Sequence, residues 1–194
     1  MKRKYVDLLA MLAICTMSSC SKNGGGSGGG GYNPPPDPGE TGTVQATLSF
    51  SSGSILALNA TGNYTLFTRR IDAAHGDTLI VLSGSLPDAT GQLTIRLTNI
   101  DMPGTYPFVS RNVPPPSSGY ALCEFLDYSH AIFYSTQQVV GNSGSITVQS
   151  LNSSSISATF NAVVSNWYPG TTDPVITIAI TNGSLGGNFK TYYY

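Results

Sequence analysis

Cys123 and the two histidines, His75 and His130, are the residues whose chemistry could support nucleophilic catalysis in this chain of 194 residues. His130 lies seven residues after Cys123, and a cysteine beside a histidine can act as a thiolate nucleophile. The sequence supplies no recognisable group to orient the histidine and no oxyanion donor. Cys123 also stands among apolar neighbours, where thiols are usually inert. We therefore expect Cys123 to be a buried structural residue and predict no catalytic residues.

Two groups of carboxylates could do other chemistry. Glu124 and Asp127 would suit glycoside hydrolysis, but residues three apart on a strand point to opposite faces, so we expect solvated charges. Asp72 and Asp77 bracket His75 and could hold calcium, yet the D-x-[DN]-x-[DN]-G pattern of a calcium loop is absent. A polar loop is the simpler interpretation. We predict no metal and no cofactor.

Aromatic side chains are the remaining candidates for binding, because rigid rings with a polar tip suit sugar stacking or protein contact. Most of them are expected to pack at strand ends, and they are Tyr106, Tyr120, Tyr128, Tyr134 and Tyr192 to Tyr194. Trp167 and Tyr168, beside Pro169-Gly170, are the pair that we single out as an exposed binding site for a glycan or an envelope protein.

Charge excludes one class of partner. The chain has 9 Lys and Arg and 10 Asp and Glu residues; removing residues 1–19, with Lys2, Arg3, Lys4 and Asp7, leaves 6 and 9, a net charge of −3. Few, scattered cations cannot form a phosphate-binding surface, so we expect no nucleic-acid partner. Arg69, Arg70 and Arg111 are expected to solubilise strand ends.

The elements that would position these residues are strands, because apolar residues recur at every second position. Such alternation predicts strands with one buried and one wet face, over 44–50, 92–98, 145–149, 156–162 and 176–180. The segment 78–82 (TLIVL) is apolar on both faces and predicts a central strand. No comparable segment downstream of the signal peptide repeats at helical spacing.

Turn residues separate these strands at intervals that are too short for helical crossovers, so neighbouring strands should pair antiparallel. We predict an all-β fold, an antiparallel β-sandwich or a partly closed barrel of about ten strands. Asn182-Gly183 could form a type I′ turn before a last edge strand at 189–193. The segments 120–126 and 131–135 should form a hairpin, with a short helix at 121–128 as the alternative.

Several short segments of the second half occur in a fixed order: Gly104-Thr105-Tyr106, Tyr134-Ser135-Thr136, residues 143–148, residues 155–160 and residues 180–185. Their order resembles a family of bacterial lipoprotein domains of unknown function with G-T-Y, Y-S-T, G-x-I-x-I, I-x-G-T-F and I-T-N-G-x-F segments. Ala158 replaces the usual Gly and Leu185 the usual Phe, which alters packing. The resemblance covers roughly residues 91–189. It implies a β fold and an envelope location, with no catalytic residues to transfer.

The N-terminal segment resembles a lipoprotein signal peptide. Positive residues at 2–4 precede a short apolar run at 8–15, too short to span a bilayer. Met17-Ser18-Ser19-Cys20 is similar to a lipobox, with Met17 where Leu is usual. We expect Cys20 to become the acylated first residue, which anchors the chain in the outer membrane. The alternative is an ordinary signal peptide that leaves Cys20 as a free thiol.

Residues 21–31 (SKNGGGSGGGG) are typical of a flexible linker, and residues 33–38 (NPPPDP) of a stiffer extended one. The predicted organisation is a signal peptide at 1–19, an acylated cysteine and tether at 20–43 and a single β domain at 44–194. Only Cys123 would be left in the domain, so no internal disulfide is expected. The sequence does not decide between display on the cell surface and the periplasmic side.

Two functions fit these features. The first is a non-enzymatic, lipid-anchored binding or structural module of the cell envelope. The alternative is a secreted envelope hydrolase acting on polysaccharide or peptide, in which loop residues at 110–130 converge with residues 72–77 in one polar cleft.

Overall fold

The computed structural model of the chain describes residues 41–112, 114–117, 119–166 and 175–194. Within these residues the regular structure consists of twelve strands and two single-turn 3-10 helices, η2 (Gly62–Tyr64) and η3 (Thr136–Gln138). The all-β fold class predicted from the period of two is therefore confirmed.

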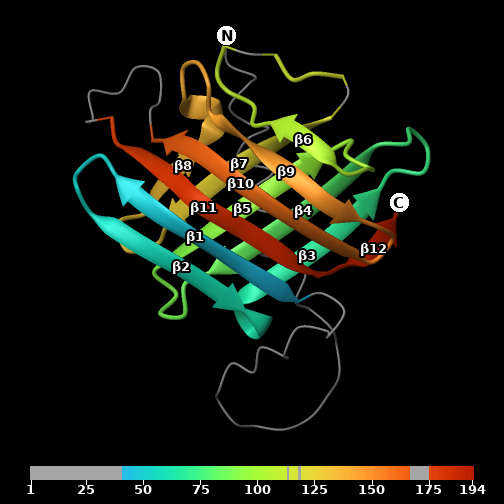
Figure 1. Cartoon of the computed structure of the whole chain (residues 1–194), viewed down its shortest axis with the longest axis horizontal. Coiled ribbons are helices and arrows are strands. Elements are labelled where there is room, and N and C mark those ends of the chain that lie inside the picture. Colours follow the sequence, from blue (N-terminus) through green and yellow to red (C-terminus); the bar gives the residue numbers. More distant parts are fainter. Residues whose placement is uncertain (1–40, 113, 118, 167–174) are drawn as a thin grey trace, which may run out of the picture. The chain divides into compact units, whose positions relative to one another are not determined.

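The strands form two layers (Figure 1). The layer that we call the front sheet contains, in spatial order, β6 (Gly104–Pro107), β9 (Gly144–Leu151), β10 (Ser155–Ser165), β11 (Thr177–Asn188), β1 (Gly42–Phe50) and β2 (Ile55–Thr61). The back sheet contains, in spatial order, β12 (Lys190–Tyr193), β3 (Thr65–Ile71), β4 (Thr78–Ser85), β5 (Gly91–Thr98), β7 (Tyr120–Asp127) and β8 (Ile132–Ser135).

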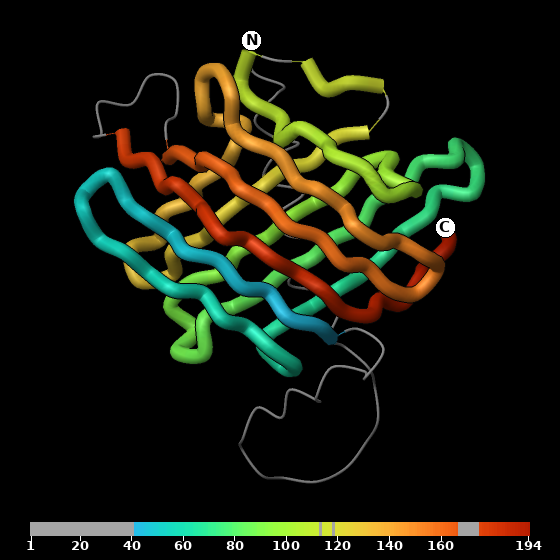
Figure 2. Tube along the Cα trace, viewed as in Figure 1, coloured from blue at the N-terminus to red at the C-terminus, as the bar shows by residue number. Residues whose placement is uncertain are grey.

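The two sheets are joined at one side. Ser135 at the end of β8 pairs with Ser165 at the end of β10, which makes one continuous path of strands. The path runs from β12 to β2 and does not close into a barrel. In Figure 2 the front strands cross over the back strands, so the arrangement is a sandwich with crossed layers.

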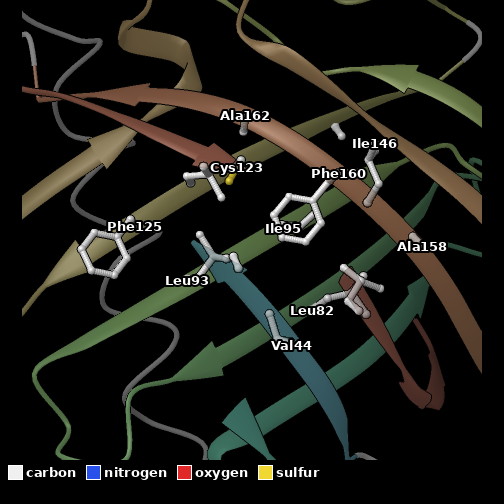
Figure 3. Packing of buried hydrophobic residues seen from close by; sticks show 14 of the residues in the cluster. Val44, Leu82, Leu93, Ile95, Cys123, Phe125, Ile146, Ala158, Phe160 and Ala162 are labelled. Carbon is white, nitrogen blue, oxygen red and sulfur yellow. The ribbon is translucent and has the colours of Figure 1, made fainter. Parts of the chain in front are cut away.

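The core lies between the sheets and is built from the alternate residues that the sequence pattern identified. Leu48 and Ile180 from the front sheet and Ile80, Leu93 and Leu97 from the back sheet have no exposed surface. Figure 3 shows how apolar side chains from strands of both layers meet in this space. Burial of this apolar surface is the main term that stabilises the fold.

Several detailed expectations are confirmed. The segment 78–82 lies in β4, a central strand between β3 and β5. The segments 120–126 and 131–135 form the hairpin β7–β8, so the alternative of a helix at 121–128 is wrong. The described residues contain twelve strands, against about ten expected, and β12 confirms the edge strand predicted at 189–193.

One expectation about Asn182-Gly183 is wrong. These residues do not form a turn but lie inside β11, where pairing with both neighbours shifts by one residue. Asn182 has a φ of 51°, which asparagine tolerates better than most residues, so the pair forms a β-bulge. The chain continues through the bulge to Asn188, and β12 then pairs with β3 in parallel. The named strands are thus antiparallel except for this pair, and one isolated parallel bridge joins Phe108 to Ala121.

Candidate binding face

Charged residues are absent from the six strands of the front sheet. Each of these strands consists of apolar residues, Gly, Pro, Ser, Thr, Asn and Gln only. In the described part of the chain, the charged side chains lie on the back sheet and in loops, at Arg69, Arg70, Asp72, Asp77, Asp88, Arg96, Asp101, Arg111, Glu124, Asp127 and Lys190. The two layers therefore differ completely in charge.

Strand pairing aligns short polar side chains across the outer surface of the front sheet. Successive pairs connect one row that crosses all six strands: Thr105, Thr147, Thr159, Ser184, Gln45 and Asn59. With strands about 4.8 Å apart, the row is about 24 Å long. We call this outer surface of the front sheet the polar face.

Neighbouring members of the row hydrogen-bond to one another. The hydroxyl oxygens of Thr105 and Thr147 are 3.0 Å apart, and Gln45 Nε2 donates to Asn59 Oδ1 at 3.1 Å. A second row on the same face contains Ser145, Asn161 and Thr181. These contacts hold side chains in place while their remaining donors and acceptors face solvent.

The bulge in β11 keeps this face continuous. Gly183 is buried, and a Cβ atom there would lie 2.6 Å from the Phe160 ring, so only glycine fits beneath that ring. Beyond the bulge, Ser184 faces outward and Leu185 faces the core. The extra residue in β11 shifts its register against both β1 and β10. On both sides of the bulge, outward-facing residues of β11 therefore lie beside outward-facing residues of its neighbours.

The side chains of the polar face are chemically suited to a hydroxyl-rich, uncharged ligand. Short Ser, Thr and Asn side chains lose little rotamer entropy when a ligand orders them. An ionic ligand would find no countercharge on these strands, and burying an unpaired charge is costly. The face offers donors and acceptors on a broad sheet instead of a deep cavity.

The outer surface of the back sheet is different, because it carries an ion pair. Arg96 Nη2 lies 3.0 Å from Glu124 Oε2, and the Glu124 side chain is 12% exposed. Burial raises the pKa of Glu124, and the nearby Arg96 charge lowers it in part. The expectation that Glu124 is a solvated charge is wrong, because it is largely buried and paired with Arg96 on β5. The sequence alone does not show this contact, since it depends on the pairing of β5 with β7.

Cys123 points from β7 into the core and has no exposed surface. Burial, and secondarily the charge of Glu124, raise the pKa of its thiol far above the usual range. The prediction of a buried cysteine is confirmed. His130 is not its partner, since His130 Nδ1 lies 2.9 Å from Asp127 Oδ2 in the β7–β8 turn.

The loop at 72–77 is built like that turn. His75 Nδ1 lies 2.8 Å from Asp72 Oδ2, and Ala74 N donates to Asp72 Oδ1 at 2.9 Å. The histidine contact and the backbone bonds lower the pKa of Asp72. Asp77 accepts a hydrogen bond from Asn99 instead. The described residues contain no cluster of three or more potential metal ligands.

The proposed convergence of the polar loops in one cleft is not present. Figure 2 places the teal-green loop at 72–77 and the gold turn at 127–130 at opposite ends of the sandwich. A cavity of about 130 Å³ lies beside the turn, lined by Phe50, Leu56, Leu86, Thr90, Phe125, Asp127, Ser129 and His130. Its lining includes one carboxylate and no thiol, so it lacks the paired carboxylates of a glycosidase.

A larger hollow of about 430 Å³ lies at the loop that follows β6. It is lined by Val109, Ser110, Arg111, Asn112, Pro114, Pro115 and Gln137. Its one charged lining side chain belongs to Arg111, and neither Cys123 nor Glu124 reaches it.

The aromatic and cationic candidates divide between core and surface. Tyr134 is buried, and its ring contacts Phe50 and Phe125 with centroid separations of 6.2 Å. Tyr128 is 49% exposed and donates to Gln92. Arg69 packs over the Phe189 ring at 5.9 Å and donates to the Asn152 carbonyl, so it does more than solubilise a strand end.

Three predicted sites lie outside the described residues: Cys20, Trp167 and Tyr168. By sequence, Trp167 and Tyr168 fall in the segment that connects β10 with β11, two central strands of the front sheet. Among the residues that the structure describes, no helix is long and apolar enough to cross a bilayer. No protein-family model, curated protein or solved structure matches this chain.

Proposed function

We propose that this chain is a lipid-anchored lipoprotein of the cell envelope whose β domain binds a neutral polysaccharide and catalyses no reaction. The observation that carries the binding proposal is the polar face, a row of short uncharged side chains across six paired strands. The anchor is Cys20, and the linker at 21–38 gives the domain reach from the membrane surface.

A neutral polysaccharide fits the polar face on three grounds. Sugar hydroxyls both donate and accept hydrogen bonds, as the Thr, Ser, Asn and Gln side chains of the face do. A long polymer can follow the row from β6 to β2. A charged polymer such as a nucleic acid would gain nothing from a face without countercharges.

The location rests on the sequence alone. The apolar run at 8–15, the lipobox-like Met17-Ser18-Ser19-Cys20 and the resemblance to a bacterial lipoprotein domain family support an outer-membrane anchor. An envelope protein is the second candidate partner, with the segment that contains Trp167 and Tyr168 as its contact.

Binding is tested with the full chain in detergent against dextran and insoluble cellulose. Thr159→Glu places a carboxylate in the centre of the row on an exposed position, so we expect affinity to fall at least about tenfold, or 1.4 kcal/mol. Thr68→Glu, on the outer surface of the back sheet, is the control and should bind normally. Failure of the unaltered chain to bind either polymer, or equal binding by both variants, would refute the assignment.

The same incubations test the hydrolase alternative. Reducing ends and free amines are measured after the chain is mixed with polysaccharide or peptide. We expect no release above the background. Release of reducing ends or free amines that rises with protein concentration would show that the chain is a hydrolase and would contradict the proposed non-enzymatic function.

The anchor is tested separately with Cys20→Ser. Because acylation needs the cysteine sulfur, we expect the variant to leave the membrane fraction and appear in the soluble fraction. Fractionation followed by immunoblotting measures this. A variant that stays with the membrane would show that Cys20 is not the anchor.

A further inference from the structure

The front sheet ends in a strand with one open side. β2 pairs with β1 along its whole length, from Ile55 to Thr61. Within the described residues, no other strand pairs with β2, and no backbone hydrogen bond outside the β1 pairing involves residues 55–61. The outward N–H and C=O groups of β2 therefore form a template for another strand.

Two other open edges among the described strands, β12 at the far end of the path and β6 beside β9, are protected in ways that β2 is not. β6 has four residues and includes Pro107, which has no backbone N–H. β12 also has four residues and carries the charged Lys190. β2 has seven residues without a charge or a proline, and its outward-facing Ile55 is 73% exposed. Short edges, prolines and lysines are the usual protection against edge-to-edge pairing.

The sequence of β2 is compatible with a second copy of itself. In an antiparallel pair centred on Leu58, Leu58 would face its own copy and Leu56 would face Ala60, all on the core side. On the outer side Ala57 would face Asn59. This register keeps buried residues with buried residues and opposes no like charges, whereas a shift by one residue would mix the two faces.

We propose that β2 pairs antiparallel with β2 of a second copy of this chain, in the register centred on Leu58. The two front sheets then become one, and their polar faces become continuous. The proposal does not depend on the ligand of the polar face, but it rests on the proposed membrane anchor at Cys20, which the Cys20→Ser fractionation tests separately. An interface of one strand pair is small, so we expect it to form where the anchor concentrates the chain in a membrane.

Disulfide trapping in membranes tests the register. In the variant Ala57→Cys, Asn59→Cys of the full chain, each new thiol would face its counterpart on the partner, and mild oxidation should give a dimer on a non-reducing gel. The control is Ala179→Cys, Thr181→Cys on β11, with the same spacing, outer face and exposure class but on an interior strand. The unaltered chain reports any contribution from Cys20, and Cys123 is buried.

We expect a dimer with the β2 cysteines and little with the β11 cysteines. Equal amounts from both variants would mean random collision and would overturn the proposal, as would no dimer at all. A cross-linked product of another mass would mean that a different protein occupies the edge, which also overturns it.

A second variant measures pairing without new thiols. Ala57→Lys, Asn59→Lys sets lysines opposite one another across the interface, so chemical cross-linking of the membrane-bound chain should fall at least fivefold. Ala179→Lys, Thr181→Lys adds the same charge on β11 and should cross-link like the unaltered chain. Equal cross-linking of the two lysine variants would contradict the interface. The cysteine pair still decides the matter if the lysine variant does not fold.

Discussion

At the scale of single residues, Glu124 is the group whose charge works against the fold. It is 9% exposed on the outer surface of the back sheet, with one carboxylate oxygen 3.0 Å from Arg96. The cost of burying its charge exceeds the attraction of Arg96, because the net effect is a raised pKa. A carboxyl group with a raised folded-state pKa is stabilising when protonated and destabilising when ionised.

We predict that Glu124→Gln raises the free energy of unfolding at pH 7, because the neutral amide removes the cost of burying a charge and keeps an oxygen facing Arg96. In the native chain, stability gained by protonation appears as the pH falls through the raised pKa towards the ordinary value of 4.5. The advantage of the variant should therefore shrink over this range and vanish near pH 4.5. Urea unfolding at several pH values measures it.

Asp88→Asn is the control of opposite sign. Hydrogen bonds from Thr90 lower the pKa of Asp88, so its ionised form stabilises the fold and this contribution is lost as the pH falls below 3.8. Asp88→Asn should be less stable than the unaltered chain at pH 7 and equal to it in strong acid. If both variants change stability in the same direction at pH 7, the account of Glu124 is wrong.

At the scale of elements, the bulge in β11 decides how the front sheet is built. β11 is the central strand that pairs with both β1 and β10, and its extra residue is shared by both pairings. Asn182 supplies the positive φ, and Gly183 leaves room for the Phe160 ring. The bulge also adds local twist to the sheet.

We predict that Gly183→Ala destabilises the chain by about 1–3 kcal/mol, since the added methyl group would overlap the Phe160 ring and its backbone oxygen. Gly186→Ala in the same strand is the matched control, because there the nearest atom is an oxygen 3.7 Å away. It should change stability by less than about 0.5 kcal/mol. Thermal and urea unfolding measure both. A mild effect at Gly183 would mean that the bulge tolerates a side chain.

The strands themselves could be predicted from the sequence, because the alternation of buried and exposed residues is a local property. Val44, Ala46 and Leu48 alternate with Gln45 and Thr47 in the sequence and also in β1. The role of Asn182-Gly183 could not be predicted from the sequence, because a positive φ at Asn182 is compatible with both a turn and a β-bulge. The choice between the two depends on β1 and β10, which continue beyond the pair and keep β11 extended.

The candidate face was predictable in composition only. A wet surface of Ser and Thr follows from the alternation. The row that joins Thr105 to Asn59 requires the order of strands in space, and that order depends on pairs between distant segments, such as Gln45 with Ser184. The Arg96–Glu124 contact is hidden for the same reason, since 28 positions separate the two residues in the chain.

At the scale of the whole domain, charge is divided between the layers. In the described residues the front sheet is neutral, whereas the back sheet and the loops carry ions of both signs. A ligand on the polar face would therefore form hydrogen bonds and van der Waals contacts and no ion pairs. Exposed ion pairs weaken when salt screens them, and neutral hydrogen bonds do not.

We predict that the affinity for a neutral polysaccharide changes by less than about twofold between 50 and 500 mM NaCl, a range that weakens charge-dependent binding strongly. Affinity electrophoresis in dextran gels at both salt concentrations measures it. A steep fall of the affinity with salt would indicate that the polysaccharide binds to the charged back sheet or loops and not to the polar face.

The pairing of β1 with β11 joins segments that are far apart in the chain, so the front sheet cannot form early in synthesis. Val44 can pair with Leu185 only after residue 185 has been synthesised. Until then β1 and β10 cannot join one sheet, because β11 lies between them. Such distant pairing makes folding slow and cooperative. A half-synthesised chain would have no finished front layer and would stay unfolded, which is the state that export through a translocation channel would require if the proposed signal peptide directs it.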